Sequence, residues 1–413
     1  MQVTNTVATQ IEAIGAGSVA PTTSRVALVH DWLTAYVGGE RVLEQMIRLF
    51  PEAGIYTTID VLNAQERSFL QGRIPHTTFA QSWPLLRRHY RMLLPLMMFA
   101  IEQLDVSDCE LVLSSSASVG KGILTGPDQL HIAYVHSPMR YAWDMQNQYL
   151  RDAGLERGLK SYIARWMLHR ARIWDLRTAN GVDHFIANSH FIAQRIWKVY
   201  RRRATVIHPP VDVDNFPLRE HKEDFYLTVS RMVPYKKVSL IVEAFKGLPQ
   251  RRLVVIGDGT EMSRVRRMAG PNVELLGYQS SSVVQDFMQR ARAFVFAAEE
   301  DFGISPVEAQ ACGTPVIAFG RGGALETIRG LEHPRPTGLF FAQQTAAGIA
   351  AAVREFEAHE FDPHACRDNA RRFSPEIFRE TYMRYVQNAW AAFKNRSPTV
   401  AADFDERLSQ RNW

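Results

Sequence analysis

Short runs of β-branched and aliphatic residues recur along the chain, and a longer segment with helical spacing of apolar positions follows most of them. Strands buried on both faces of a parallel sheet are uniformly apolar, and parallel strands are joined by crossover helices. The pattern therefore predicts an α/β protein. The expected strands are 25–30, 111–114, 132–136, 184–188 and 205–208 in the first half, and 225–230, 252–256, 273–276, 293–297 and 315–318 in the second.

One stretch, which has neither the aliphatic runs of strands nor the helical spacing of apolar positions, separates the two series of strands. Residues 208–224, HPPVDVDNFPLREHKED, hold three prolines and a cluster of charges. This composition is typical of a linker between domains. We therefore expect an N-terminal domain over residues 25–215 and a C-terminal domain over residues 216–380.

The regular pattern ends in one long helix. Ser374-Pro375 is a helix start signal, with proline at the first helical position, and the residues after it are rich in aromatics. We expect the part over residues 381–396 to pack back on the first domain. Residues 1–24 and 397–413 are expected to be flexible tails.

Composition and charge argue against several classes of protein, among them nucleic-acid-binding, disulfide-rich, zinc-binding and membrane-spanning proteins. Lys and Arg number 48 against 43 Asp and Glu, a net charge of +5, so no nucleic-acid partner is expected. Cys109, Cys312 and Cys366 are too few and too far apart for a disulfide framework or a closed zinc site. The first 24 residues lack a signal-like pattern, and the longest apolar stretch, 92–101, is about half a membrane span. We expect a cytoplasmic protein without a structural metal.

Two basic residues follow the first expected strand of the second domain. Arg231 and Lys236 lie in the sequence SRMVPYKK, between that strand and a helix. Two fixed cations beside a helix N-terminus suit a diphosphate, and open α/β sheets bind ligands at the carboxyl ends of their strands. The alternative is a surface turn with two solvated charges.

Glycines follow the next strand in IGDGTE, residues 256–261. Gly257 and Gly259 permit a tight turn from strand to helix, but the third glycine of a dinucleotide-binding loop is replaced by Met262. A turn that lets the backbone approach a ligand is the better interpretation. For the similar GRGG at residues 320–323, a plain turn is favoured.

The segment EEDFGISPVEAQAC carries the most specific pattern. Glu300 is expected in a loop at the sheet edge, and Glu308 on the first turns of the helix that follows, facing the same crevice. A carboxylate is the natural partner for the two hydroxyls of a ribose, and the backbone amides after Gly303 can donate to hydroxyls or phosphate oxygens. The alternative for Glu308 is an acid that complements the helix dipole.

In the first domain, two motifs lie where strands are expected to end. Gly38-Gly39 opens a helix and either lets the backbone touch a phosphate or forms a flexible turn. His136 ends the strand IAYVH and is expected to face the cleft between domains, where it can bond a sugar hydroxyl or a carboxylate of the other domain. Most histidines at such positions are structural, so this alternative stays open.

Taken together, the motifs resemble those of the family 4 retaining glycosyltransferases of GT-B fold. The resemblance rests on SRMVPYKK, IGDGTE, the Glu-x7-Glu segment with GRGGALE, and the first-domain elements GGERVLE, HSPMRYAWD, ANSHFIAQRI and HPPVDVDNF, from about residue 25 to about residue 395. Within the family the chain is most similar to bacterial mannosyltransferases of exopolysaccharide or O-antigen assembly. The resemblance implies two Rossmann-like domains that face each other across a cleft.

The resemblance also implies roles for the second-domain residues. Arg231 and Lys236 would clamp the diphosphate of a sugar nucleotide, and Glu308 would bind its ribose. Glu300 would lie against the transferred sugar, whose hydroxyls the backbone amides of Phe302, Gly303 and Ile304 would hold. Gly257 would belong to the turn near the donor, and Gly277 with the residues after it would lie beside the nucleobase.

For the first domain, the resemblance implies that His136 bonds the sugar and that Gly38 and Gly39 lie near the diphosphate and the acceptor. Members of the family need no metal. The DxD sequence Asp212-Val213-Asp214 lies in the linker rather than at a strand end, so turn formation explains it better than metal binding.

Two basic segments bear on the acceptor. Residues 83–104, WPLLRRHYRMLLPLMMFAIEQL, hold three arginines and no acid before Glu102, and residues 165–177 are also basic. A basic amphipathic surface helix can lie on anionic headgroups, which suits a lipid-linked acceptor. The alternative is a buried helix with a solvated basic end.

The sequence thus predicts a hexosyltransferase that moves mannose from GDP-mannose onto a lipid-linked oligosaccharide, at the cytoplasmic face of the inner membrane. One alternative is a transferase that uses a UDP-sugar. Others are a GT-B epimerase or hydrolase of sugar nucleotides, or a binding subunit without catalysis.

Overall fold

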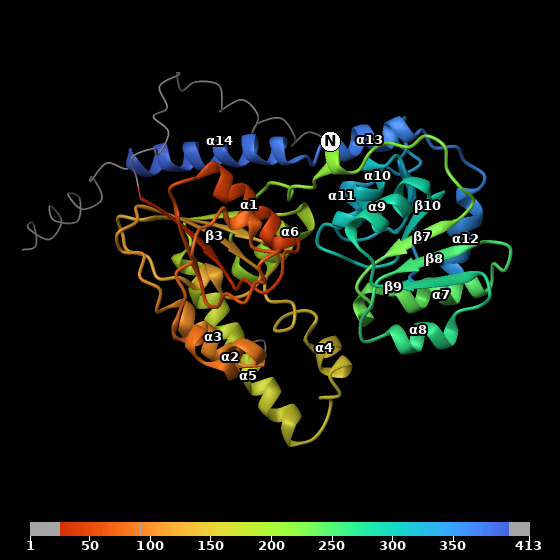
Figure 1. Cartoon of the computed structure of the whole chain (residues 1–413). Helices are drawn as coiled ribbons and strands as arrows, with labels where there is room; N and C mark the ends of the chain where they lie inside the picture. The colour runs from red at the N-terminus through yellow and green to blue at the C-terminus, as the bar shows by residue number, and fades with distance from the viewer. Residues whose placement is uncertain (1–24, 91, 396–413) are drawn as a thin grey trace, which may run out of the picture.

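A computed structural model describes residues 25–90 and 92–395 of the chain. It contains two six-stranded sheets, and every strand pair in both is parallel. Helices cover the faces of each sheet, and the two domains stand side by side (Figure 1). The predicted α/β class is confirmed.

The first sheet has the order β2-β1-β3-β4-β5-β6. Its strands are β1 (Val26–His30), β2 (Gly54–Thr57), β3 (Leu111–Ser116), β4 (Leu130–Val135), β5 (His184–Ala187) and β6 (Ala204–Val206). The helices of this domain are α1 (Gly38–Leu49), α2 (Pro84–His89), α3 (Leu94–Ile101), α4 (Gln146–Asp152), α5 (Leu159–Thr178) and α6 (His190–Tyr200).

The second sheet has the order β12-β11-β10-β7-β8-β9. Its strands are β7 (Tyr226–Val229), β8 (Leu253–Ile256), β9 (Val273–Gly277), β10 (Ala293–Phe296), β11 (Val316–Phe319) and β12 (Gly338–Phe341). The helices are α7 (Val238–Lys246), α8 (Met262–Met268), α9 (Ser281–Arg290), α10 (Ile304–Ala311), α11 (Ala324–Thr327), α12 (Ala346–Phe356), α13 (Pro363–Arg371) and α14 (Pro375–Lys394).

All ten expected strands are present, and the structure adds β2 and β12. Each added strand has four residues and begins with glycine, which is depleted in strands, so neither stands out as an aliphatic run. Both lie at or next to a sheet edge, where the burial that produces such runs is incomplete.

Residues 83–104, which the sequence left open as a surface helix or as a buried helix with a solvated basic end, do not form one helix. The structure has two short helices, α2 and α3, with Pro95 in the first turn of α3. Proline fits a first turn but cannot continue a helix, so the second helix starts afresh there. Helix α3 buries Met97 and Ile101, among other residues, in the first domain.

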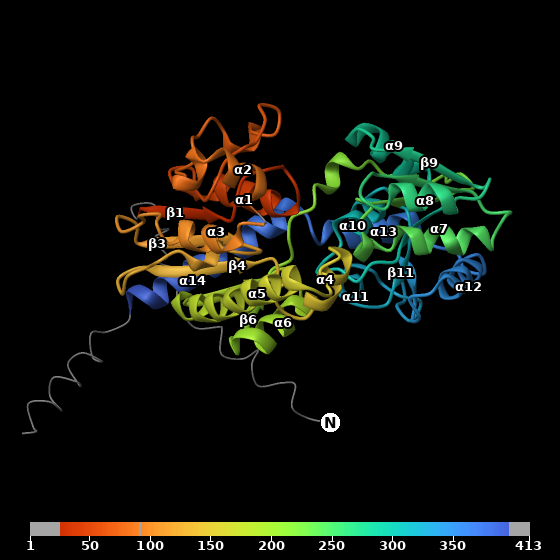
Figure 2. The same cartoon turned by 90° about the horizontal axis from the view of Figure 1, so that it is seen from below.

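Helix α14 crosses from the second domain and runs along the first (Figures 1 and 2). The hydroxyl of its N-cap, Ser374, accepts a hydrogen bond from the backbone N–H of Ile377. Its apolar side chains Phe378, Tyr382 and Trp390 are buried in the same core cluster as β1 and β4. The last helix therefore covers the first domain while its chain connection lies on the second.

No helix among the described residues is long and apolar enough to cross a membrane. Cys109, Cys312 and Cys366 are buried, free thiols. The expected tails, residues 1–24 and 397–413, lie outside the described residues.

Candidate active site

The carboxyl ends of the two sheets meet across a cleft. Gly38 begins α1 after β1, and the position that a Cβ would take on it is 3.1 Å from Cδ1 of Ile304 at the start of α10. A side chain at residue 38 would therefore press on the second domain. This glycine is explained by the close approach of the two domains at the place where the sequence predicts a ligand.

His136 follows β4 and lies beside the same turn. A Cβ on Gly39 would stand 3.6 Å from Nε2 of His136 and 3.4 Å from Cε1 of His30. The Nε2 atom of His136 is 2.8 Å from Oγ of Ser115, the fifth residue of β3. The backbone at Gly39 therefore lies within van der Waals reach of both histidine rings.

His136 is neutral at pH 7. Burial and, to a smaller extent, the nearby His30 lower the pKa of its imidazole to about 3, although Glu40 acts in the opposite direction. A neutral imidazole keeps one donor and one acceptor nitrogen. His136 can therefore exchange hydrogen bonds with a hydroxyl but does not supply a positive charge.

Glu40 stabilises the glycine turn, a role that was not predicted from the sequence. Its carboxylate accepts a hydrogen bond of 3.1 Å from the backbone N–H of Val37 and lies 3.4 Å from Nε2 of His30. Burial is the largest single influence and opposes both charges, but the hydrogen bond and the charge attraction between the partners, together with smaller contributions, outweigh it, so the pKa of His30 is raised and the pKa of Glu40 is lowered. Glu40 thus connects the turn to β1.

On the second domain, Lys236 and Glu300 form an ion pair. Lys236 ends the short 3-10 turn Pro234–Lys236 ahead of α7, and Glu300 lies in the loop after β10. Both side chains are largely buried. Arg231 lies nearby in sequence but is exposed, and its Nη2 atom donates to the hydroxyl of Tyr235 over 3.1 Å.

Glu308 lies on α10 and reaches the first domain. Its Oε1 atom accepts a hydrogen bond of 2.9 Å from Nη1 of Arg41 on α1. Burial opposes the charge of Arg41, but the Glu308 carboxylate more than compensates, so the pKa of the guanidinium is raised. The carboxylate expected to bind a ribose is thus partnered across the cleft.

A cavity of about 670 Å³ opens beside this pair. Arg41 and Glu308 line it together with Tyr278 and Gln279, which follow β9. Gly277 ends β9 with φ +66°, and no heavy atom lies within 4 Å of the position of a Cβ. Tyr278 is 82% exposed. The cavity therefore brings Glu308 together with the loop predicted to lie beside a nucleobase.

The glycines of IGDGTE have a different explanation. Gly257 has φ +134°, and a Cβ there would stand 1.9 Å from the carbonyl oxygen of Ser230. A Cβ on Gly259 would be 2.5 Å from the carbonyl oxygen of Met232. Both glycines are therefore needed for packing against the segment that carries Arg231 and Lys236.

The GRGG turn supports the loop of Glu300. A Cβ on Gly322 would be 2.4 Å from the carbonyl oxygen of Glu300, and one on Gly323 would be 2.3 Å from Cα of Phe302. The N–H of Gly323 donates to the carbonyl of Glu300 over 2.8 Å. GRGG forms a turn, which is the interpretation that the sequence favours. Gly322 and Gly323 are required in it because the backbone of the Glu300 loop packs directly against them. Gly303, in that loop, is the N-cap of α10 with φ +89°.

Further contacts across the cleft were not predicted. Asp301, next to Glu300, pairs with Arg140 and Arg195 of the first domain. Glu326 accepts hydrogen bonds from the backbone N–H groups of His190 and Phe191 at the start of α6. Such partners lie more than 100 residues apart in the sequence, so no local pattern reveals them.

The described residues contain no group of three or more His, Cys, Asp or Glu side chains that could hold a metal ion. Asp212 and Asp214 of the DxD sequence lie at a 3-10 turn, Val213–Asn215. Asp212 accepts from Asn215, and Asp214 pairs with Arg367 over 3.2 Å. Both carboxylates thus have structural partners.

The structure thus brings the predicted residues into three groups along one cleft. Gly38 adjoins Ile304 and Gly39 adjoins His136, Lys236 pairs with Glu300, and Glu308 shares the cavity with the loop after Gly277. Within the described part of the chain, Arg231 forms no hydrogen bond or ion pair with these three groups, and Gly257 packs against the segment that carries Arg231.

Two family models cover most of the chain. Residues 36–215 match the model described as Glycosyltransferase Family 4, and residues 212–373 match the model described as Glycosyl transferases group 1. The two matches adjoin at the segment between β6 and β7.

Curated relatives match part of the chain. An uncharacterized glycosyltransferase of Methanocaldococcus jannaschii is 31% identical, over 35% of this chain and 42% of the relative. A D-inositol 3-phosphate glycosyltransferase of Mycobacterium avium is 28% identical, over 38% and 43%. An alpha-1,3/1,6-mannosyltransferase of Candida glabrata is 22% identical, over 48% and 56%. The chain spans about half the length of the curated relatives it matches.

Solved structures share the whole fold. HepE of Anabaena, in complex with UDP and glucose, has a TM-score of 0.61 and 16% identity and covers 88% of this chain and 99% of its own. Sucrose-phosphate synthase of Thermosynechococcus elongatus has a TM-score of 0.64 and 18% identity and covers 89% and 100%. At these identities the likeness shows the fold. The expected GT-B arrangement of two Rossmann-like domains across a cleft is confirmed.

Proposed function

We propose that the chain, which matches the models described as Glycosyltransferase Family 4 and Glycosyl transferases group 1, transfers a hexose, with retention, from a sugar nucleotide to an acceptor hydroxyl. The bond from the anomeric carbon to the diphosphate breaks, and a bond to the acceptor oxygen forms. The products are a glycoside, a nucleoside diphosphate and the proton of the acceptor hydroxyl.

We base the proposal on one observation: three groups of side chains lie where the two domains face each other. Lys236 pairs with Glu300, Glu308 lines the cavity with Tyr278, and His136 lies behind the glycine turn. A sugar nucleotide offers three parts to such side chains: a base with its ribose, a diphosphate and a sugar.

The leaving group requires positive charge. We assign Lys236 and Arg231 to the diphosphate, where fixed cations stabilise the charge that develops as the anomeric bond breaks. In the structure Lys236 is neutralised by Glu300. An incoming diphosphate would take over this cation and leave the Glu300 carboxylate free to accept from sugar hydroxyls.

The sugar lies between Glu300 and His136 in this proposal. The backbone N–H groups of Phe302, Gly303 and Ile304 lie at the start of α10, where amides are free to donate. The side chain of Ile304 packs against Gly38, so the glycine turn of the first domain lies next to the start of α10. Neutral His136 completes the set as a hydrogen-bond partner.

For the donor we propose GDP-mannose, and for the acceptor a lipid-linked oligosaccharide of exopolysaccharide or O-antigen assembly, at the cytoplasmic face of the membrane. The support is the resemblance of the motifs to bacterial mannosyltransferases and the similarity to a mannosyltransferase of Candida glabrata. A UDP-sugar is the second candidate, because a fold neighbour is in complex with UDP.

Product formation from radiolabelled sugar nucleotides tests the proposal. The labelled hexose is expected to move from GDP-mannose to a membrane-lipid extract that contains lipid-linked saccharides, and to stay on the nucleotide without the extract. Turnover of the donor without acceptor would show an epimerase or hydrolase instead. Nucleotide binding without turnover in any extract would show a binding subunit.

A further inference from the structure

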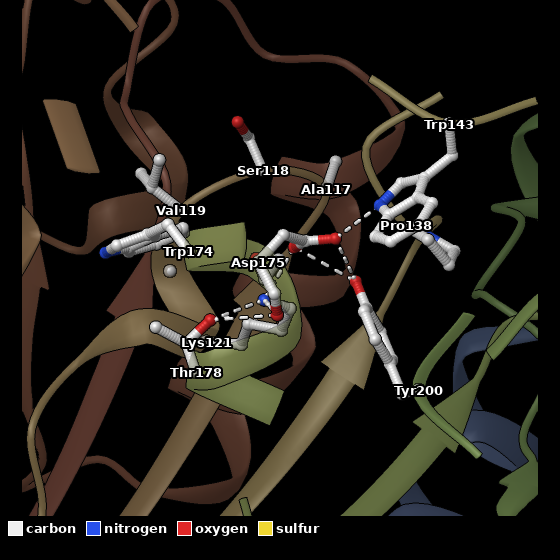
Figure 3. A network of polar contacts seen from close by, with 12 residues as sticks. Ala117, Ser118, Val119, Lys121, Pro138, Trp143, Trp174, Asp175, Thr178 and Tyr200 are labelled. Atoms are coloured by element: carbon white, nitrogen blue, oxygen red, sulfur yellow. Dashed lines mark hydrogen bonds and ion pairs between the residues drawn. The ribbon is translucent and has the colours of Figure 1, made fainter. Parts of the chain in front are cut away.

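A buried ion pair joins two elements of the first domain (Figure 3). Lys121 and Asp175 are 2% and 0% exposed, with 2.7 Å between Nζ and Oδ1. The Lys121 ammonium also donates to the hydroxyl of Thr178 over 2.9 Å. Replacing a buried ion pair by well-packed apolar residues is often neutral or stabilising, whereas losing one partner is costly. The pair is therefore explained better by the geometry that it fixes than by the stability that it adds.

The lysine of this pair comes from a turn that is held at the end of β1. Lys121 is the middle residue of the 3-10 turn Gly120–Gly122, after β3. Asp31, which directly follows β1, accepts hydrogen bonds from the backbone N–H groups of Val119 and Gly120 over 2.8 and 2.6 Å. Since the acid of the pair lies on α5, the pair fixes that helix relative to the carboxyl end of β1.

Helix α5 holds the backbone turn that contains Arg140. The indole N–H of Trp143 donates to Oδ2 of Asp175 over 2.7 Å, so both oxygens of the buried carboxylate are engaged (Figure 3). Arg172, also on α5, donates to the carbonyl of Ala142 over 2.7 Å. The backbone N–H of Trp143 in turn closes the turn around Arg140. The position of Arg140 therefore follows from the position of α5.

Arg140 reaches across the cleft to the loop after β10. It forms an ion pair with Asp301 of that loop, and Nη1 of Arg195 on α6 lies 3.3 Å from the other oxygen of the same carboxylate. Asp301 is the residue after Glu300, and the GRGG turn of the second domain packs against the backbone of the same loop. The loop of Glu300 is thus held from both domains.

We infer that Arg140 is a positioning residue, which fixes the loop of Glu300 from across the cleft. The buried network behind it, which ends in Trp143, sets where Arg140 lies. The loop therefore takes the geometry needed at the sugar only while the two domains face each other. A small misplacement of a group at the reacting centre is enough to slow turnover strongly. This inference rests on the proposed function, because the role of Glu300 at the sugar belongs to it.

Transfer from GDP-mannose to the membrane-lipid extract measures the effect on the full chain. Arg140→Gln is expected to lower kcat about a hundredfold while the affinity for GDP changes less than about threefold, because a slightly misplaced group costs turnover without touching the nucleotide. Arg140→Lys keeps a cation opposite Asp301, so its kcat should recover to within about tenfold of the wild-type value.

Two carboxylates pair with Arg195, Asp301 across the cleft and Asp144 within the first domain. Asp301→Asn should lower kcat at least as much as Arg140→Gln, and the double variant should lose no more than Asp301→Asn alone, because the two residues act as one unit. The matched control is Asp144→Asn, which removes a carboxylate from Arg195 without breaking a contact between the domains. Its kcat should stay within about threefold of the wild-type value.

Hydrogen exchange of the unliganded chain gives a second readout, which does not depend on the reaction. Trp143→Phe keeps a ring but removes the indole donor to Asp175, and we expect the backbone amides of residues 299–304 to exchange about tenfold faster. The matched control is Trp174→Phe, which removes an indole hydrogen bond of the same length, 2.7 Å, between α5 and Glu102. It should leave the exchange of residues 299–304 unchanged.

Four results would overturn the inference. They are a wild-type kcat in Arg140→Gln, a loss of GDP affinity in Arg140→Gln as large as its loss of kcat, an equal loss of kcat in Asp144→Asn, and equal exchange in Trp143→Phe and Trp174→Phe. Transfer by the wild-type chain would leave the proposed function standing in each case. A wild-type chain that transfers no sugar loses the proposed function, and the exchange of residues 299–304 then decides alone whether the first domain positions the Glu300 loop.

Discussion

Arg41 on α1 donates a hydrogen bond to Glu308 on α10, with 2.9 Å between Nη1 and Oε1, and so joins the two domains through one carboxylate. Both residues line the cavity that also holds Tyr278. If this carboxylate binds a ribose, the same side chain contacts both the other domain and the ligand.

Glu308 should give the site its preference for ribose. We expect the wild-type chain to bind GDP about ten- to a hundredfold more tightly than 2′,3′-dideoxy-GDP, because hydrogen bonds to a charged acceptor contribute about 1.5–3 kcal/mol. Glu308→Gln should reduce this preference to within about threefold. Isothermal titration calorimetry measures both affinities.

The control for this prediction is Arg41→Gln. It removes the charged partner but leaves the Glu308 carboxylate in place, so the preference for the ribose hydroxyls should remain. An unchanged preference in Glu308→Gln would refute the assigned role.

Removal of either proposed diphosphate cation should weaken nucleotide binding. Arg231→Gln and Lys236→Gln each remove a charge-assisted contact, and we expect about a ten- to a hundredfold loss in affinity for a nucleoside diphosphate. The affinity for the nucleoside should change little, since it has no phosphate.

Lys237→Asn is the neighbouring control for the two cations. Lys237 has φ +58°, a conformation that asparagine tolerates, so the turn should survive the change. A loss in Lys237→Asn as large as in Lys236→Gln would show that general charge, and not a specific clamp, attracts the nucleotide.

Glu300→Gln should separate turnover from binding. The carboxylate is proposed to act on the sugar, so kcat should fall by about a hundredfold or more while the affinity for the nucleoside diphosphate changes less than about threefold. Steady-state kinetics and calorimetry give the two quantities. Equal losses in both would indicate that Glu300 acts only by placing Lys236.

Acid should destabilise the fold through a buried histidine of β4. Burial lowers the pKa of His131 to about 4 from 6.5, while its backbone hydrogen bond to Gly181 acts the other way. Between these values the unfolded chain binds more protons, so stability falls as the pH falls. Its Nε2 atom lies 2.8 Å from Oγ of Ser114.

Urea denaturation at pH 7 and pH 4.5 measures this effect. The wild-type chain should lose about 2 kcal/mol more unfolding free energy between the two values than His131→Asn, which does not titrate there. Equal losses in the two proteins would show that His131 does not contribute to acid sensitivity.

The sequence predicted what depends on local pattern. The aliphatic strands and the start of α14 at Ser374-Pro375 follow from burial on two faces and from capping, and both are local. Strand β2, GIYT, was missed because a four-residue strand with a leading glycine has no clear period. Residues 83–104 do not form one helix because the break at Pro95 outweighs the amphipathic pattern.

For the candidate site, the sequence identified residues but not their partners. That Gly257 is required by the carbonyl of Ser230, or that Asp301 pairs with Arg140, depends on segments folded together from distant parts of the chain. Glu40 was overlooked because a capping acid in GGERVLE looks like any helix start. The pairing of Lys236 with Glu300 was likewise invisible, since 64 residues separate them.

The most direct test of the cleft as a sugar-nucleotide site is thermal unfolding of the full chain with GDP, UDP, ADP and their sugar conjugates, at matched concentrations and with EDTA present. A ligand at a hundred times its dissociation constant stabilises the folded state by about 2.7 kcal/mol. We predict that GDP and GDP-mannose raise the Tm and that the other nucleotides do so less. A larger shift with UDP would keep the site and replace the donor, whereas an unchanged Tm with every nucleotide would contradict the assignment of the cleft.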